Sequence, residues 1–123
     1  MSKEITDAFI KVINREILDV AYTPLSTYIE DNYSRLDLTY KAKIVGNVEQ
    51  ATLMDFELIR VADITQNNDK LMFQVVVDAE IEIEETIRRD REVEGVNKWF
   101  VLSCSAEIDN IPNSFAVEFI KAY

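Results

Sequence analysis

The stretch LMFQVVVDAEIEI, residues 71–83, decides the fold of this 123-residue chain. Its odd-numbered positions are apolar from Leu71 to Ile83, and acids occupy the even-numbered positions from Asp78 onward. Such alternation is typical of a β-strand with one buried face, because successive side chains point to opposite sides of a sheet. At about 3.3 Å per residue the stretch spans roughly 40 Å, so we expect an unusually long strand in a sheet that curls.

Four further segments have strand patterns, at 38–44, 53–64, 98–108 and 114–121. In the second of these, Met54, Phe56 and Leu58 share one parity, and the apolar residues then change to the opposite parity. This change predicts a β-bulge near Ile59 and Arg60, because one extra residue exchanges the two faces of a strand. In the last segment, the residues expected to point inward are Phe115, Val117 and Phe119.

Polar residues separate these strands. Residues 46–47, 66–69 and 110–113 carry turn signals, and residues 85–96, which include Gly95, are expected to form a charged connection. Short turns favour antiparallel pairing of sequential strands.

The N-terminal part of the chain has a helical pattern. Apolar residues recur at spacings of three and four over residues 3–21, with polar residues on the other side. Thr23 followed by Pro24 is typical of a helix start, so we expect a second helical segment at 24–31 and a kink or break at 22–24.

These elements predict a single α+β domain over residues 1–123. A helix with one apolar stripe and a sheet with one apolar face are expected to pack against each other. The expected architecture is an N-terminal helix on a curled five-stranded antiparallel meander, of cystatin-like or NTF2-like appearance.

Composition excludes several classes of function. The net charge of −10 disfavours direct binding of nucleic acid and of anionic membranes, and favours either a basic protein partner or a role in solubility alone. The chain has no histidine, one cysteine and two glycines, so we expect no catalytic triad, metal site or nucleotide cofactor. The lone cysteine and the absence of a secretory or membrane-spanning pattern predict a cytoplasmic protein. The missing catalytic motifs predict that it is not an enzyme.

The charged hairpin after residue 77 is the candidate functional surface. Its candidate residues are Asp78, Glu80, Glu82, Glu84, Arg88, Arg89, Arg91 and Trp99. One interpretation is a solvated face whose acids pair with cations from neighbouring strands, among them Lys41, Lys43 and Lys98. A second is a docking surface for a protein partner, with the tryptophan as its anchor. A third, a pair of carboxylates acting as general acid and base, needs a concave and partly desolvated site.

The positions of the cysteine and of four tyrosines in the sequence pattern predict their roles. Cys104 lies at a core parity and is expected to be a buried, inert thiol. Four tyrosines near the helix end and the first strand lie either at the edge of the core or at the mouth of a pocket between helix and sheet; they are Tyr22, Tyr28, Tyr33 and Tyr40.

Residues 71–109 also carry a family resemblance. The alternating strand, the bend R-R-D-R-E at 88–92 and the motif W-F-x-L-S-C-x-A at 99–106 resemble a segment upstream of the peptidase domain in ImmA/IrrE-type metallopeptidase proteins of Firmicutes. The resemblance extends over residues 36–120. It implies an accessory domain coupled to a zinc peptidase that cleaves repressor proteins. The chain lacks the peptidase's HExxH motif, so no catalytic residue is carried over.

The sequence therefore favours a non-catalytic protein-interaction or regulatory domain. The alternatives are a module that binds a small ligand in a cavity between the helix and the curled sheet, and a stand-alone acidic inhibitor from a mobile element. The final strand, which ends at Tyr123, is expected to offer an edge for pairing with a second copy.

Overall fold

The computed structural model describes residues 3–36, 38, 47–87 and 90–123. The described elements in chain order are α1 (Lys3–Asn32), β1 (Asn47–Asn67), β2 (Lys70–Ile87), β3 (Asp90–Glu107), the 3₁₀ turn η1 (Ile108–Asn110), α2 (Ile111–Ser114) and β4 (Ala116–Ala122). The strands form an antiparallel sheet in the order β1-β2-β3-β4. The α+β class and the antiparallel meander are confirmed.

The described residues contain four strands rather than the five expected. The missing one, at 38–44, lies outside the described residues except for Leu38, which is buried. The turn at 46–47 also falls mostly outside them. The turn between β1 and β2 is confirmed and is tight, because Asn67 pairs with Lys70 and Asn68 takes a positive φ of 57°. Asparagine tolerates this left-handed conformation better than most residues.

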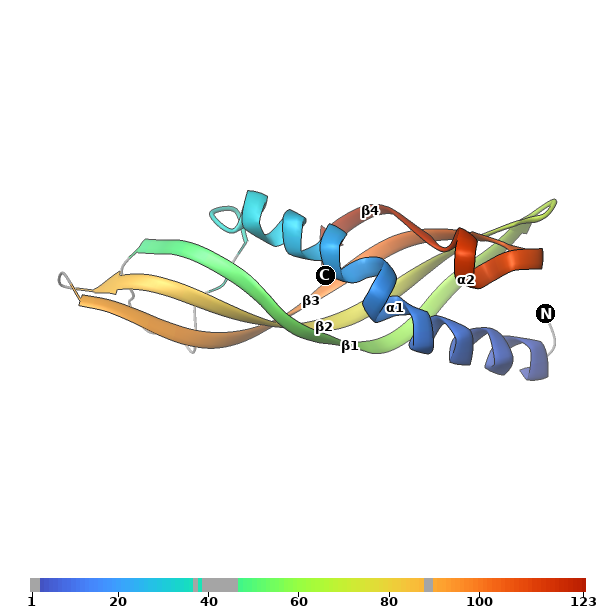
Figure 1. Ribbon diagram of the computed structural model, residues 1–123, viewed down its shortest axis with the longest axis horizontal. Helices are drawn as coiled ribbons and strands as arrows, with labels where there is room; N and C mark the ends of the chain where they lie inside the picture. The colour runs from blue at the N-terminus through green and yellow to red at the C-terminus, as the bar shows by residue number, and fades with distance from the viewer. Residues whose placement is uncertain (1–2, 37, 39–46, 88–89) are drawn as a thin grey trace.

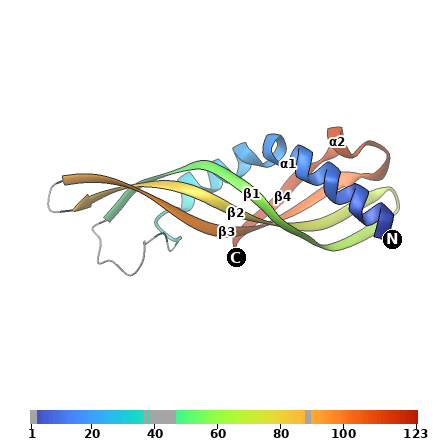
Figure 2. The same cartoon turned by 90° about the horizontal axis from the view of Figure 1, so that it is seen from below.

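The helix lies across one face of the twisted sheet, and the end of the sheet near the β2–β3 turn extends beyond it (Figure 1 and Figure 2). The core forms between them. Its helix side is a stripe with a spacing of four, made by Phe9, Ile13, Ile17, Ala21, Leu25 and Ile29. Its sheet side includes all the odd-numbered residues of β2 from Leu71 to Ile83, as the alternation predicts.

The chain stays helical across Pro24, so, of the kink or break expected at 22–24, the break into two helical segments is wrong. A proline inside a helix removes one hydrogen bond and costs about 3 kcal/mol. Ala21 and Leu25 on either side of it are fully buried, and Ile29 follows one turn later. Burial of a large aliphatic side chain contributes roughly 1.5–3 kcal/mol, so packing of this stripe offsets the local helix-breaking signal.

β1 contains surplus residues that bend it relative to β2. Its register shifts between Leu58 and Arg60, which confirms the predicted bulge at Ile59. Further shifts occur at 48/50, 53/55 and 62/65. The shift at 53/55 makes Met54 a surplus residue, so it is exposed and does not share the core face as expected. Tyr22 Oη donates a 2.9 Å hydrogen bond to the carbonyl of Leu53 beside this bulge, which ties α1 to β1.

The charged segment 85–96 is not a connection. β2 continues to Ile87, β3 begins at Asp90, and these two residues pair with each other. The bounds predicted for both strands were therefore too short at the ends next to the turn. Backbone hydrogen bonds between strands need no apolar side chains, so a ladder can continue where the alternation of apolar residues has ended.

The last strand differs from the prediction in the face that one of its residues takes. Phe115 is buried and Val117 packs against the core as predicted, but Phe119 is 62% exposed. A register shift explains this, because Cys104 pairs with Val117 and Ser103 with Phe119, which leaves Glu118 as a surplus residue. Beyond the shift, the core-facing residues are Ile120 and Ala122. The turn expected at 110–113 is replaced by η1 and α2.

Candidate functional site

The face of the sheet opposite α1, called here the outer face, carries all the predicted site residues that the structure places. Asp78, Glu80, Glu82 and Glu84 alternate with buried core residues of β2, so they share this face as predicted. Trp99 lies on the same face because it pairs with Asp78 in the neighbouring strand. It is 40% exposed.

The predicted cations cannot all be placed. Arg88 and Arg89 lie outside the described residues, as do Lys41 and Lys43, and only the backbone of Arg91 is described. Lys98 pairs with the buried Ala79 and so lies on the helix side of β3. The prediction that Lys98 offsets the acids of the outer face is therefore wrong, since neighbouring residues of a strand point to opposite faces.

The acids continue from β2 onto β1. Glu57 pairs with Asp78, and Asp55 pairs with Glu80. These four residues, called here the acidic row, line an open depression of about 240 Å³ together with Asn97 and Phe56. Asn97 Nδ2 donates a 3.2 Å hydrogen bond to Asp78 Oδ1, and Asp55 Oδ1 accepts a 2.8 Å bond from the backbone N–H of Phe56. The depression is open to solvent, which does not favour the general acid–base interpretation.

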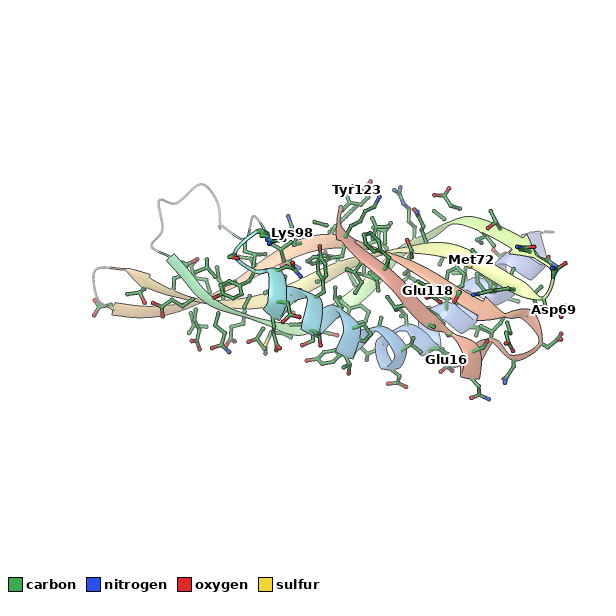
Figure 3. All side chains as sticks on the ribbon, turned by 90° about the horizontal axis from the view of Figure 1, so that it is seen from above. Glu16, Asp69, Met72, Lys98, Glu118 and Tyr123 are labelled. Carbon is green, nitrogen blue, oxygen red and sulfur yellow. The ribbon has the colours of Figure 1, made fainter. Side chains whose placement is uncertain are left out.

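An apolar patch adjoins the acidic row on the same face. Val76 and Val101 pair with each other and are both buried, although they lie opposite the helix and outside its core. The aromatic side chains around them are Trp99, Phe119 and Tyr123, and these five residues are called here the outer patch. Tyr123 follows the end of β4 (Figure 3). Its exposure, like that of Phe119, is 62%.

Specific contacts hold the aromatic residues in place. The rings of Trp99 and Tyr123 meet edge to face with centroids 5.3 Å apart, and the backbone N–H of Tyr123 donates to the carbonyl of Trp99 at 2.9 Å. Arg60 Nη2 donates to Tyr123 Oη at 3.1 Å, and its guanidinium lies 5.7 Å from the centre of the same ring. Edge-to-face ring pairs contribute about 0.5–1.5 kcal/mol beyond area burial, so these contacts hold the rings of Trp99 and Tyr123 in place.

Sequence reasoning missed four of the five residues in the outer patch. Two signals were present: three consecutive valines at 75–77 interrupt the alternation, and Val101 shares the parity of Trp99. No alternation signal could place Phe119, because its face depends on the bulge at Glu118.

The remaining predicted residues are structural. Cys104 is fully buried, and burial, followed by the nearby charge of Glu118, raises the pKa of its thiol from 9.0 to about 12. This agrees with an inert thiol. Tyr28 meets Phe100 edge to face at 6.1 Å, and both Tyr28 and Tyr33 pack against the core, which supports the core-edge interpretation for these two tyrosines. Tyr40 lies outside the described residues.

Within the described part of the chain, no group of three or more cysteine or acidic side chains could hold a metal ion. No helix in that part is long and apolar enough to span a membrane. Comparisons with protein-family models, with curated proteins and with solved structures found no match for this chain. The resemblance of residues 71–109 to the region upstream of ImmA/IrrE-type peptidases stays a prediction, and the candidate site rests on the geometry of the outer face.

Proposed function

We propose that this chain is a non-catalytic protein-interaction domain whose outer face binds a basic protein partner. The observation that carries the proposal is the outer patch, where Phe119 and Tyr123 are each 62% exposed and where Trp99 pairs with Asp78 of the acidic row. Exposed apolar surface rimmed by polar residues is typical of binding sites. Aromatic anchors supply most of the affinity of such interfaces, and the surrounding charges select the partner.

The charges on this face favour a partner rich in lysine and arginine. The acidic row places Asp55, Glu57, Asp78 and Glu80 around one depression, and the whole chain has a net charge of −10. Complementary charge speeds association and weakens as salt is added. We propose that this contact takes place in the cytoplasm. The resemblance to a peptidase accessory region suggests a regulatory role beside a repressor-cleaving zinc peptidase, which stays a proposal.

The test uses a randomised peptide library displayed on phage and selected on the immobilised protein. The site variant combines Trp99→Ala, Glu80→Lys and Glu82→Lys. We expect the selected peptides to be rich in lysine, arginine and aromatic residues, and to lose binding to the site variant. Their affinity for the wild type should fall as salt is raised.

A matched control separates the site from general charge. The control variant combines Leu18→Ala, Asp19→Lys and Glu30→Lys, which remove one exposed apolar residue and reverse two exposed acids on α1. It has the same net charge as the site variant and should bind the peptides like the wild type. Peptides without basic residues, or equal loss of binding in both variants, would contradict the proposal.

A stand-alone acidic inhibitor would use the same surface, and the gene context distinguishes the two roles. An open reading frame that continues into an HExxH helix would favour the accessory domain. A native protein of 14.2 kDa that blocks a basic enzyme surface would favour the inhibitor.

A second candidate function is binding of a small apolar ligand. A groove of about 450 Å³ lies beside the N-terminal half of α1, and its lining is almost entirely apolar: Ala8, Phe9, Val12, Leu71, Ile108 and Ile111, with Gln66. The cystatin-like or NTF2-like appearance expected from the sequence would place a ligand between helix and sheet.

The probe for this binding is the dye 1-anilinonaphthalene-8-sulfonate. Its fluorescence should rise on binding and be lost in Ala8→Trp, which fills the groove. Dye binding that Ala8→Trp leaves unchanged would exclude this groove.

A further inference from the structure

β4 is an outer strand of the sheet with one free side. It pairs with β3, and among the described residues no strand pairs with it on the other side. Figure 3 looks toward this free side, where β4 runs from Tyr123 past Glu118 with α1 beside it. The backbone N–H and C=O groups on the free side of an edge strand can bind another extended chain.

The backbone groups that point to the free side belong to Ile120 and Ala122. The backbone N–H of Tyr123 donates to the carbonyl of Trp99, so the backbone groups of Tyr123 point toward β3. This direction alternates from one residue to the next along a strand. The groups of Ala122 and Ile120 therefore point away from β3. They form a regular row, because the register shift of β4 lies before Phe119.

A groove lies between this edge and the C-terminal half of α1. Its volume is about 390 Å³, and residues 117–120 form its β4 wall. The helix wall consists of Pro24, Thr27, Tyr28, Asp31 and Asn32. A strand added beside β4 would therefore bond to the backbone of β4 and contact the side chains of α1 on its helix side.

The groove is acidic and continuous with the outer patch. Asp31 and Glu118 line it, as does Phe119, which belongs to the outer patch. Ser105 Oγ donates to Glu118 Oε1 at 2.6 Å and so holds that carboxylate in position. Lys121 is a nearby cation, but it pairs with Val101 and so lies on the outer face. The helix side of the groove thus favours basic residues, and the outer side favours apolar ones.

We propose that an extended segment of the basic partner adds to β4 as a further strand of the sheet. This strand addition, which rests on the proposed function, specifies how the partner binds. Successive side chains of the added strand point to opposite faces. Those on the helix side meet Asp31 and are lysine or arginine. Those on the outer face lie beside Phe119 and are apolar.

A second copy of this chain fits the groove less well than a basic segment. Pairing of β4 with β4 would bring Asp31 and Glu118 of both copies to the same interface. Each copy also has a net charge of −10, so the two chains repel each other.

The test follows backbone amide exchange by nuclear magnetic resonance as a synthetic heptapeptide is added. The peptide has lysine at its odd-numbered positions and phenylalanine or valine at the even-numbered ones. Binding should slow the exchange of the N–H groups of Ile120 and Ala122, which point to the groove. The N–H of Lys121 points to β3 and should exchange as before. A control peptide with the same residues in an order without alternation should bind more weakly.

Two pairs of variants test the backbone and the charge separately. Ala122→Pro removes an outward N–H, which an edge strand tolerates, and Ala122→Val enlarges the side chain but keeps that group. The proline variant should bind the alternating peptide about two- to tenfold more weakly, the usual effect of one hydrogen bond, and the valine variant should bind it like the wild type. Asp31→Lys should weaken binding, whereas Glu30→Lys, at an exposed position outside the groove, should not.

The outcomes distinguish strand addition from the proposed function. Peptide binding without protection of Ile120 and Ala122 would overturn strand addition and leave the binding of a basic partner standing. Equal binding by Ala122→Pro and Ala122→Val would overturn it as well. So would failure of the alternating peptide to bind while phage-selected peptides do. Protection that appears without peptide and rises with protein concentration would assign the edge to a second copy instead.

Discussion

Deleting Ile59 should leave the pairing of β1 intact on both sides of the deletion. Leu58 pairs with Val77 and Arg60 pairs with Val76, so Ile59 is the surplus residue between two consecutive pairs. Its removal closes the bulge without changing which residues face the core. Deleting Phe56, only three residues earlier, should have the opposite effect because that residue occupies a regular position opposite Ala79.

The expected loss on deleting Ile59 follows from its exposure. Its side chain is 38% exposed, so only part of the roughly 1.5–3 kcal/mol for burying an isoleucine is lost. We expect the free energy of unfolding to fall by about 1–2 kcal/mol. Deletion of Met54, the surplus residue of the preceding bulge, should have an effect of similar size, since that side chain is also exposed.

The loss on deleting Phe56 should be much larger. Removing a buried phenylalanine costs about 3–5 kcal/mol. The strand can then close the gap by consuming a neighbouring bulge, which brings Glu57 into the vacant core position if the bulge at Ile59 is used. If the bulge at Met54 is used, Asp55 takes that position. Either way an acid is buried, and the total exceeds about 5 kcal/mol, which is comparable with the whole stability of many domains.

Urea unfolding gives both values, followed by far-ultraviolet circular dichroism and by the fluorescence of Trp99, the single tryptophan of the chain. Coincident curves from the two probes would support a two-state transition. Equal losses for the deletions of Ile59 and Phe56 would refute the reasoning, because Ile59 would then not be surplus to the register.

Three further predictions use the same unfolding assay. Ile13→Ala on the buried side of α1 should lower the free energy of unfolding by about 2–5 kcal/mol, whereas Leu18→Ala, 46% exposed on the same helix, should change it by no more than about 0.5 kcal/mol. Phe119→Ser should also change stability by less than about 1 kcal/mol while weakening peptide binding, and a large loss of stability would mean that this ring serves packing. The raised pKa of Cys104 gives a contribution to stability that is fully present below pH 9.0 and is lost as the pH rises through about 12. At about 1.4 kcal/mol per pH unit, the wild type should lose on the order of 2–3 kcal/mol relative to Cys104→Ala between pH 9 and 11, and parallel loss in both proteins would contradict this.

The parts of the fold that could be predicted are those in which one periodicity continues without interruption. The alternation in residues 71–83 correctly assigned the buried side of β2, and the change of parity after Leu58 located a bulge. A parity change is visible only when apolar residues stand on both sides of it. The bulge at Glu118 has such residues on both sides, but the alternation of Val117 and Phe119 continues through it and hides the shift.

The errors at Pro24 and at the charged hairpin have a common physical cause. Both were local signals that long-range contacts overcame. The proline would end an isolated helix, yet the stripe from Phe9 to Ile29 is buried along its whole length. The charged residues of 85–96 have weak strand patterning, yet each strand of the hairpin has a regular neighbour with which to form backbone hydrogen bonds.

The acidic residues of β2 in the candidate site could be predicted from the sequence, but the apolar residues of the outer patch other than Trp99 could not. Alternation placed the acids of β2 on one face, but their neighbours Asp55 and Glu57 on β1 depend on the register between strands, which bulges determine. The contact between Trp99 and Tyr123 joins β3 to the residue after β4, and a strand pattern holds no information about which residues meet across a sheet.

The composition of the outer patch supports the proposed binding of a partner, because packing alone does not require its exposed aromatic side chains. Val76 and Val101 are buried on the face opposite the helix, so other side chains of that face must cover them. Long charged side chains could cover two valines with their aliphatic stems and keep their charges in water. The ladder places two such side chains, Arg60 and Lys121, directly opposite Val76 and Val101. It adds Trp99, Phe119 and Tyr123 on the same face and leaves much of each ring exposed. Exposing aromatic surface to water is unfavourable and promotes association, so solubility and folding alone do not account for this choice. We propose that a partner which covers the rings and neutralises the adjacent acids accounts for it.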